Sequence, residues 1–100
     1  MTSRALYTAA ARADLRSIAA YIAQNSPERA AAYVREIRAH CQRLALRPRM
    51  HRLREEYGHG VRAAVHGPYL VLYTIRTDET VVVERVFHAA QGQAPPIEPH

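Results

Sequence analysis

The sequence predicts one α+β domain in which a helical hairpin packs on one face of a mainly antiparallel four-stranded sheet. In the first half, apolar residues recur at helical spacing, whereas from residue 61 to residue 88 they alternate with a period of two. Turn residues at 67–68 and 77–79 divide the second half into three strands. With a short strand ahead of the helices, the predicted order is β-α-α-β-β-β. A chain of 100 residues is long enough for one such core and not for two.

The first strand is predicted at residues 4–8, and the hydroxyl of Thr8 can cap the helix that follows. Five apolar residues form one stripe of that helix: Ala11, Leu15, Ile18, Ala19 and Ile22. The stripe indicates an amphipathic helix of about four turns that packs on the sheet. The helix is expected to end at the Asn25-Ser26-Pro27 break.

A second helix is predicted to begin after Ser26, a suitable cap, with Pro27 in the first helical position, where a missing N–H costs nothing. Its apolar seam consists of Ala30, Val34, Ile37, Cys41 and Leu44, and Pro48 ends it. Because few residues join the two helices, we expect an antiparallel hairpin. Cys41 lies on the seam, which predicts a buried packing residue; a reactive thiol is the alternative.

Residues 47–60 lack periodicity and are predicted to form a basic connecting loop, with an edge strand near residues 52–55. The next strand begins after Gly60, and residues 69–76 are apolar on both faces, which predicts a central strand. In the last strand, residues 80–88, simple alternation sets Val82, Glu84, Val86 and His88 against Val81, Val83, Arg85 and Phe87. Each face then carries a charged residue, so the sequence leaves its core face open. If Tyr69 and Tyr73 are partly exposed on the sheet face away from the helices, that face can receive a partner's helix or strand.

The tail, residues 91–100, contains three prolines and one glycine and is predicted to be flexible, so the domain is expected to span residues 1–90. The chain has one cysteine, no apolar run near the roughly 18 residues of a membrane span, and no signal-peptide pattern. These features predict a cytoplasmic protein.

The formal net charge of +5 is unevenly distributed. Residues 29–54 contain eight arginines and one acidic residue, Glu36, so this segment carries +7 and the rest of the chain −2. Such a concentration favours an anionic partner, either nucleic acid or an acidic protein surface. The alternative is that arginines near the end of a helix complement its dipole and keep its surface solvated.

Two groups of residues, taken in order, carry a family resemblance. The first group is Tyr7, Ala13-Asp14-Leu15, Ile18, Tyr21-Ile22, Ala30, Ile37, Leu44 and Pro48. The second is Gly60-Val61-Arg62, Gly67-Pro68-Tyr69, Leu72-Tyr73 and Glu84-Arg85-Val86-Phe87-His88. Over residues 4–89 the chain resembles the ParE family of the ParE/RelE toxin superfamily. Family members usually continue from that histidine into an Arg-Asp pair, whereas Ala89-Ala90 follows here.

The resemblance implies a RelE/ParE-like fold and a toxin of a type II toxin-antitoxin module, neutralised by a ParD-like antitoxin that binds it directly. ParE members characteristically inhibit DNA gyrase, and RelE relatives cut messenger RNA on the ribosome. We expect a non-enzymatic inhibitor of gyrase whose arginines can also contact nucleic acid. The predicted target-binding residues are Arg43, Arg47, Arg49, Arg52, Arg54, Arg62, Tyr69, Tyr73 and Arg85.

The alternative is a ribosome-dependent endoribonuclease, which needs a general base, a general acid and cations around the phosphate. Its candidate residues are Glu55 (or Glu56), Arg62, Arg85 and His88. The absence of lysine and the alanine after His88 argue against it. His88 can instead be a hydrogen-bonded residue that closes the last strand, and the two arginines can pair with Glu84 or Glu56. The histidines are spaced too widely for a zinc motif, and no Gly-rich phosphate loop occurs, so we expect no metal and no cofactor.

Overall fold

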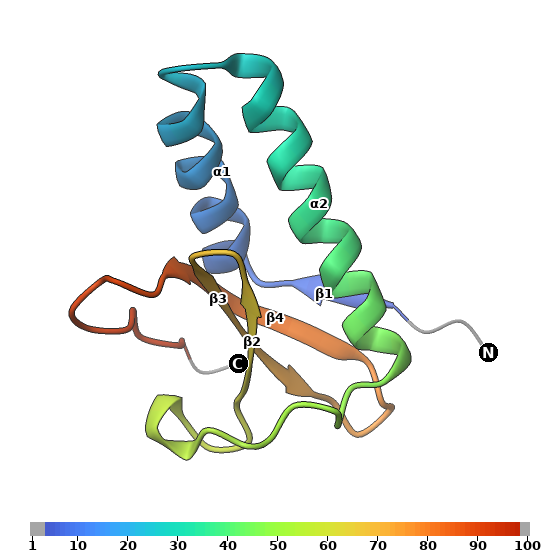
Figure 1. Cartoon of the computed structure of the whole chain (residues 1–100). Coiled ribbons are helices and arrows are strands. Elements are labelled where there is room, and N and C mark those ends of the chain that lie inside the picture. The colour runs from blue at the N-terminus through green and yellow to red at the C-terminus, as the bar shows by residue number, and fades with distance from the viewer. Residues whose placement is uncertain (1–3, 99–100) are drawn as a thin grey trace.

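The computed structural model describes residues 4–98 of the chain. Its elements are β1 (Ala5–Tyr7), α1 (Ala9–Ala23), α2 (Pro27–Leu46), the short 3₁₀ helix η1 (Glu55–Tyr57), β2 (Arg62–His66), β3 (Tyr69–Ile75) and β4 (Val81–His88). Figure 1 shows the two helices as a hairpin that stands over one face of the sheet. The predicted α+β class and the β-α-α-β-β-β order are confirmed.

Both helices begin at the predicted caps. The side-chain oxygen of Thr8 accepts a hydrogen bond from the Ala11 N–H at 3.0 Å, and that of Ser26 accepts one from the Arg29 N–H at 3.2 Å. Pro27 occupies the first position of α2, where its missing N–H costs no helical hydrogen bond. The caps fix where each helix begins, and the apolar stripes then fix which side faces the sheet.

The strand order in the sheet is β1-β4-β3-β2. β1 runs parallel to β4, while the β4–β3 and β3–β2 pairs are antiparallel. β3 therefore lies inside the sheet, which confirms its predicted central place. β1 pairs only with Val81, Val82 and Val83, so the second half of β4 lies beyond the end of β1.

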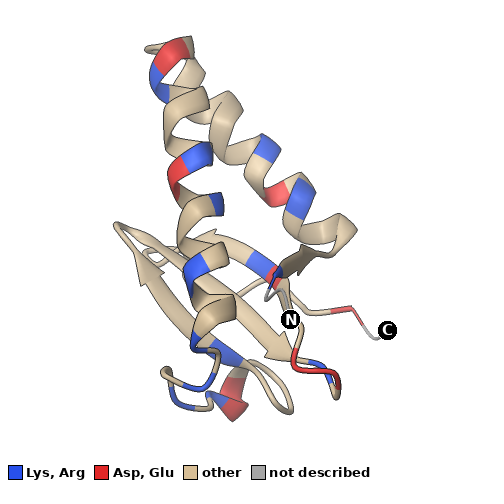
Figure 2. Ribbon diagram, turned by 90° about the vertical axis from the view of Figure 1, so that its right-hand side faces the viewer, with Lys and Arg blue, Asp and Glu red and all other residues tan. Residues whose placement is uncertain are grey.

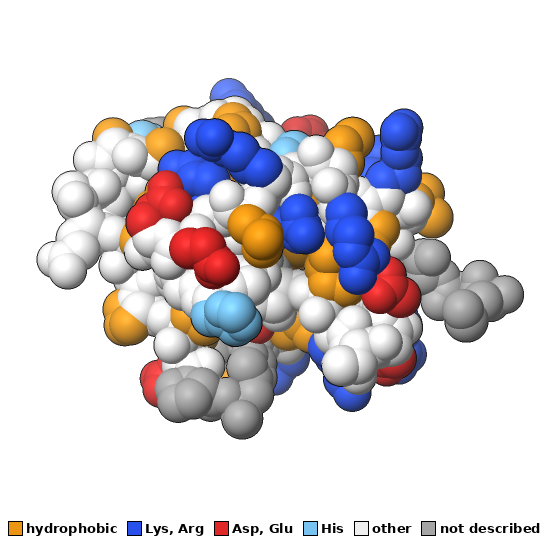
Figure 3. Space-filling view, turned by 90° about the horizontal axis from the view of Figure 1, so that it is seen from below, with side chains coloured by type: hydrophobic (Ala, Val, Ile, Leu, Met, Phe, Trp, Pro, Cys, Tyr) orange, Lys and Arg blue, Asp and Glu red, His pale blue; other side chains and the backbone are white. Residues whose placement is uncertain are grey.

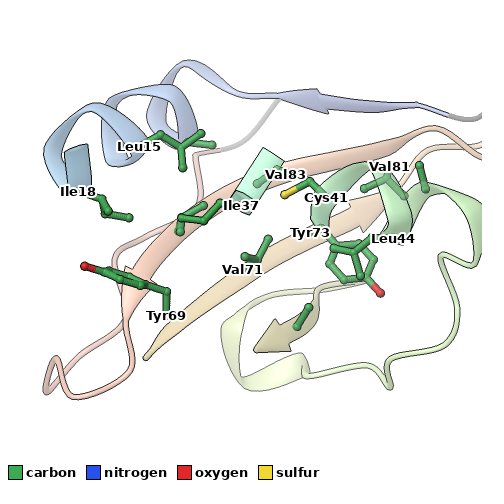
Figure 4. Packing of buried hydrophobic residues seen from close by; sticks show 14 residues of the cluster. Leu15, Ile18, Ile37, Cys41, Leu44, Tyr69, Val71, Tyr73, Val81 and Val83 are labelled. Atoms are coloured by element: carbon green, nitrogen blue, oxygen red, sulfur yellow. The ribbon is translucent and has the colours of Figure 1, made fainter. Parts of the chain in front are cut away.

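The main core lies between the hairpin and the sheet, and Figure 4 shows its side chains converging from both layers. Ile37 and Cys41 of α2 meet Val71 of β3 and Val83 of β4 there, all fully buried. The predicted burial of Cys41 is confirmed, and burial raises the pKa of its thiol. A buried, protonated thiol is a poor nucleophile, so Cys41 acts as a packing residue.

A β-bulge in β4 changes which residues face the hairpin. Leu72 pairs with Arg85, but the next residue, Tyr73, pairs with Val83, so Glu84 is the extra residue of the bulge. The extra residue reverses the alternation: Val83 and Val86 belong to the core under the hairpin, although they are three positions apart in the sequence. The simple alternation predicted for this strand is therefore wrong beyond residue 83.

Tyr69 and Tyr73 do not lie on the open sheet face, so the condition under which they would offer a docking face there is not met. Both belong to the core under the hairpin and are 8% and 0% exposed. The face away from the helices carries a smaller cluster built on Val61, Leu72 and Phe87. The central strand is apolar on both faces, so its sequence holds no signal for which face the helices cover.

Part of the tail packs on this second cluster, where Ala94 and Ile97 contact it and the Pro96 carbonyl accepts a hydrogen bond from Arg85 at 2.8 Å. Residues 99–100 of the predicted flexible tail lie outside the described residues, and its flexibility stays a prediction. Within residues 4–98, no helix combines the length and apolar character that a bilayer span requires.

Candidate target-binding surface

The most distinctive surface is the segment from the last turn of α2 into the following loop, residues 43–54, called here the arginine loop. Three large apolar side chains are exposed on it: Leu46 (68%), Met50 (61%) and Leu53 (47%). They alternate along the chain with exposed arginines, namely Arg43, Arg47, Arg49 and Arg52. The sequence analysis identified the arginines but missed the apolar residues. The signal was present, because none of the three belongs to the helical seam or to an alternating strand.

A buried side chain, Tyr73, and a partly buried one, Arg62, hold the arginine loop against the sheet. The Tyr73 hydroxyl donates a hydrogen bond to the Pro48 carbonyl at 2.8 Å, and Arg62 donates one from Nη1 to the His51 carbonyl at 2.6 Å. Burial is the main cause that raises the pKa of Tyr73, so its hydroxyl stays protonated and able to donate. Both residues were predicted to touch a target, and the structure places them beneath the loop.

Further contacts fix the outer side of the loop. The Arg49 guanidinium pairs with both carboxylate oxygens of Glu79, in the turn between β3 and β4, and its second bond measures 2.9 Å. Arg54 bonds Glu56 through Nε at 2.8 Å and lies over the Tyr57 ring at 5.2 Å. These two arginines are therefore already engaged within the molecule.

The edge strand predicted near residues 52–55 is reduced to a single bridge between Leu53 and Arg62. The chain then turns into η1, where the Glu55 carboxylate accepts a hydrogen bond from the Gly60 N–H at 3.0 Å. This local hydrogen bond closes the turn between residues 55 and 60, and the pairing with β2 does not extend beyond the one bridge.

Arg43, Arg47 and Arg52 form no ion pair with any residue between 4 and 98. Figure 2 shows basic residues at several points along the helices and in the loop beneath the sheet. In Figure 3, which views the side opposite the hairpin, arginine side chains alternate with hydrophobic ones. The arginine loop thus offers uncommitted positive charge beside exposed apolar surface.

Arg85 is committed to a different contact. Its Nε and Nη2 atoms donate to the two carboxylate oxygens of Asp14 on α1 at 2.8 and 2.9 Å, and the same carboxylate accepts the Val86 N–H at 3.0 Å. The bond to Asp14 is the main cause that raises the pKa of Arg85. Asp14 therefore supplies a hydrogen-bond acceptor for the Val86 N–H, on the part of β4 that extends beyond β1. The same contacts connect α1 to the sheet.

The structure does not bring the four ribonuclease candidates together. Arg62 stands in register with Tyr73, and His88 stands in register with Tyr69. Four strand positions separate these two registers, which is about 13 Å along β3. One phosphate cannot contact both Arg62 and His88.

The other two candidates are also apart. Arg85 is in register with Leu72 of the second cluster, on the face opposite Tyr73, and its guanidinium is bound by Asp14. Glu55 lies in η1 and is exposed. The residue types for phosphate cleavage are present, but their positions do not surround one reacting group.

Comparison with known proteins identifies the family of this chain. Residues 5–92 match the family model described as the ParE toxin of type II toxin-antitoxin system, parDE. This chain belongs to the ParE toxin family. It is therefore a toxin of a type II toxin-antitoxin system, as the resemblance of its motifs implied.

Two solved structures are similar to this ParE toxin. A chain of the chromosomal ParDE toxin-antitoxin system from P. aeruginosa aligns with a TM-score of 0.72 at 21% identity, covering 87% of the toxin and 96% of that chain. A chain of the toxin-antitoxin complex RelBE2 from Mycobacterium tuberculosis aligns with a TM-score of 0.58 at 32% identity, covering 88% and 99%. The comparison with curated protein sequences gave no match.

His88 of the ParE toxin ends β4, and its Nδ1 accepts a hydrogen bond from the Ala90 N–H at 3.1 Å. Its ring also meets the edge of the Tyr69 ring, with centroids 5.3 Å apart. This geometry matches the interpretation of His88 as a hydrogen-bonded residue that closes the last strand.

The toxin also has a hollow of about 940 Å³ away from the arginine loop. It is lined by β1, the start of α1, parts of β3 and β4, and the tail: Leu6, Tyr7, Thr8, Ala9, Ala10, Thr74, Arg76, Val82, Glu84 and Glu98. Half of these residues are apolar, and apolar atoms make up most of the exposed lining surface. In the part of the toxin that is described, no three histidine, cysteine or carboxylate side chains come together as a metal-holding group.

Proposed function

We propose that this toxin acts as a non-enzymatic inhibitor of DNA gyrase in the cytoplasm and that the arginine loop is its target-binding surface. The observation that carries the proposal is the contrast between two sets of residues. The candidates for RNA cleavage are dispersed over both faces of the sheet, whereas uncommitted arginines and exposed apolar residues are concentrated on one rigidly held segment.

The composition of the arginine loop suits a protein interface. Arginine and methionine are enriched at interfaces, where apolar side chains exclude water and guanidinium groups form bidentate hydrogen bonds with carboxylates. Arg47 and Arg52, which flank Met50, combine these properties. The same guanidinium groups can contact the phosphates of DNA held by gyrase. Their charge also speeds the encounter with an acidic partner at low salt.

A supercoiling assay with purified gyrase tests the proposal. The double variant Arg47→Ala/Arg52→Ala is expected to weaken inhibition at least tenfold, since about 1.4 kcal/mol of lost contact energy is a factor of ten in affinity. The double variant Arg16→Ala/Arg29→Ala is the matched control, because it also removes two exposed arginines and both lie outside the arginine loop. Wild-type toxin that leaves supercoiling unchanged at saturating concentration would refute gyrase inhibition. Equal loss in both variants would show that only net charge matters.

The second candidate function is ribosome-dependent RNA cleavage, which the 32% identity to the RelBE2 chain favours. Under our proposal, translation of a reporter message in a cell-free system continues in the presence of the toxin. We also expect His88→Ala to stay toxic, provided that circular dichroism shows it folded. Ribosome-dependent cuts in the message, absent with His88→Ala, would reverse the order of the two functions.

We further propose that a ParD-like antitoxin, encoded beside the toxin, covers the hollow next to β1. β1 is a three-residue edge strand, and the hollow beside it offers a large apolar surface to an amphipathic segment. Leu6→Glu should weaken antitoxin binding and restore toxicity under co-expression, whereas Val65→Glu, on the far edge strand, should not. If the neighbouring protein neither binds the toxin nor rescues growth, this part of the proposal fails.

A further inference from the structure

Two histidines from different elements face each other at the edge of the sheet. The Nδ1 atoms of His40, on α2, and His66, the last residue of β2, lie 2.9 Å apart, and the ring centroids are 5.1 Å apart. Both rings are half-buried. Two imidazole nitrogens at this distance form a hydrogen-bonded pair, and the same separation is close to that of two nitrogens bound to one metal ion.

The surroundings hold the pair in place. The edge of the Tyr33 ring contacts the His66 ring, with centroids 5.5 Å apart. Behind this contact, Gly67 has a φ of 55°, and a Cβ there would lie 2.9 Å from the Tyr33 hydroxyl. The turn therefore brings the end of β2 close to α2, which reduces the freedom that the two rings lose when they bind an ion.

We propose that His40 and His66 form a two-imidazole site for a divalent transition-metal ion, with water completing the coordination. Imidazole nitrogen suits Zn²⁺, Ni²⁺ and Cu²⁺. At a bond length of about 2.0–2.1 Å, two nitrogens on one ion lie roughly 3.0 Å apart in a square arrangement and about 3.4 Å apart in a tetrahedral one. The observed 2.9 Å already matches the spacing in the square arrangement, and ligation requires both rings to turn so that their Nδ1 lone pairs converge on the ion.

The charge state of the pair is compatible with ligation. Burial, followed by the neighbouring His66, lowers the pKa of His40, so this ring is neutral at neutral pH and can offer a lone pair. Moving the remaining shared proton to Nε2 frees both Nδ1 atoms, and no redox step or leaving group is involved. Arg43 and His51 act against a bound cation, since both also disfavour positive charge on His40.

A bound ion would join α2 to the edge strand β2, across 26 residues of sequence. The unfolded chain does not hold these rings together, so the ion would bind the native state preferentially. At a free metal concentration of 100 times the Kd, the folded-to-unfolded ratio rises about 100-fold. For a domain of this size, that ratio corresponds to a rise in Tm of roughly 10–20 °C.

Calorimetric titration of tag-free protein with NiCl₂ and CuCl₂ at pH 7.5 tests the site. We expect one saturable equivalent that His40→Ala and His66→Ala each remove, while His59→Ala retains it, since the His59 ring is fully exposed and contacts no other histidine between residues 4 and 98. Arg43→Ala should tighten binding, because it removes a repelling charge. Binding that persists in the double variant His40→Ala/His66→Ala, or tracks His59, would overturn the proposal.

A measurement on the wild-type protein guards against variants that fail to fold. With one equivalent of Cu²⁺, the electron paramagnetic resonance spectrum should show two equatorial imidazole nitrogens. With Zn²⁺, the NMR signals of the His40 and His66 rings should shift together in one saturable step. One coordinated nitrogen, or shifts confined to other histidines, would leave the pair as a hydrogen bond alone and refute the metal site. The outcome is independent of the gyrase assay, because neither measurement involves the target.

Discussion

Replacing Asp14 by alanine tests whether Arg85 serves structure or a target. The substitution removes the acceptor of two hydrogen bonds from the Arg85 guanidinium and of one from the Val86 N–H. It also leaves the cation without its counter-ion in a place where the two side chains are only 18% and 15% exposed. The hydrogen bond from Arg85 to the Pro96 carbonyl remains.

The magnitude follows from this geometry. Removing one partner of a fully buried pair costs about 3–5 kcal/mol. Because water reaches part of this pair, and one other acceptor of Arg85 survives, we expect Asp14→Ala to lower the free energy of unfolding by about 2–3 kcal/mol. Asp14→Asn keeps an oxygen that can accept the Val86 N–H, so it should cost about half as much.

The assay is urea unfolding monitored by circular dichroism, with thermal unfolding alongside. A loss of about 2–3 kcal/mol in a domain of this size lowers Tm by roughly 10–20 °C. A double-mutant cycle with Arg85→Ala should give a coupling energy of about 1–2 kcal/mol. Glu56→Ala, which breaks the exposed pair with Arg54, is the control and should leave the midpoint unchanged. An Asp14→Ala protein as stable as the wild type would refute the structural role of this pair and leave Arg85 available to a target.

Three further perturbations probe the arginine loop, the turn and the histidine pair. Tyr73→Phe removes the hydroxyl that donates to the Pro48 carbonyl, so it should lower the free energy of unfolding by about 0.5–1.5 kcal/mol. It should also speed proteolysis of the arginine loop, and an unchanged rate of proteolysis would contradict the role of this hydrogen bond. Gly67→Ala meets both a positive φ and the Tyr33 hydroxyl, and should destabilise by about 1–2 kcal/mol; an unchanged midpoint would disprove the close approach. The pKa of His40 is lowered in the native state, so below about pH 6.5 the unfolded chain takes up a proton that the native ring resists, and stability should fall as the pH decreases. His40→Ala should flatten this slope, measured as the urea midpoint from pH 7.5 to 5; an equal slope in both proteins would assign it to other groups.

Local chemistry explains which parts of the fold the sequence could predict. The caps at Thr8 and Ser26 depend on contacts three residues away, and the helical seam that includes Ile37 depends on spacing alone. Such signals can be read from one sequence. The predicted boundaries of the four strands agree with the observed ones to within a residue or two, because the turn residues that limit the strands are also local signals. The order of the elements along the chain followed from the same signals, and the motif resemblance agreed with it.

The remaining features depend on contacts between distant residues. Asp14 and Arg85 are 71 positions apart, and neither residue type signals its partner. The bulge at Glu84 is a property of the pairing between β3 and β4, because the sequence of β4 alone continues the alternation without a break. Tyr73 had no predictable side, since its strand is apolar on both faces. These are the residues at which the predicted site and the observed one differ.

The position of Tyr73 and Arg62 beneath the arginine loop changes their expected role in target recognition. An irregular loop that becomes ordered only on binding loses conformational freedom at that moment, which weakens affinity. Here the loop is already fixed at the Pro48 and His51 carbonyls by donors from the sheet. Substitutions of these two donors should therefore weaken target binding because the free loop becomes less ordered. The loss of affinity should diminish when the loop is stabilised in another way. Substitutions of exposed loop residues such as Met50 should weaken binding without changing loop protection, so the two groups can be separated by measuring both quantities on the same variants.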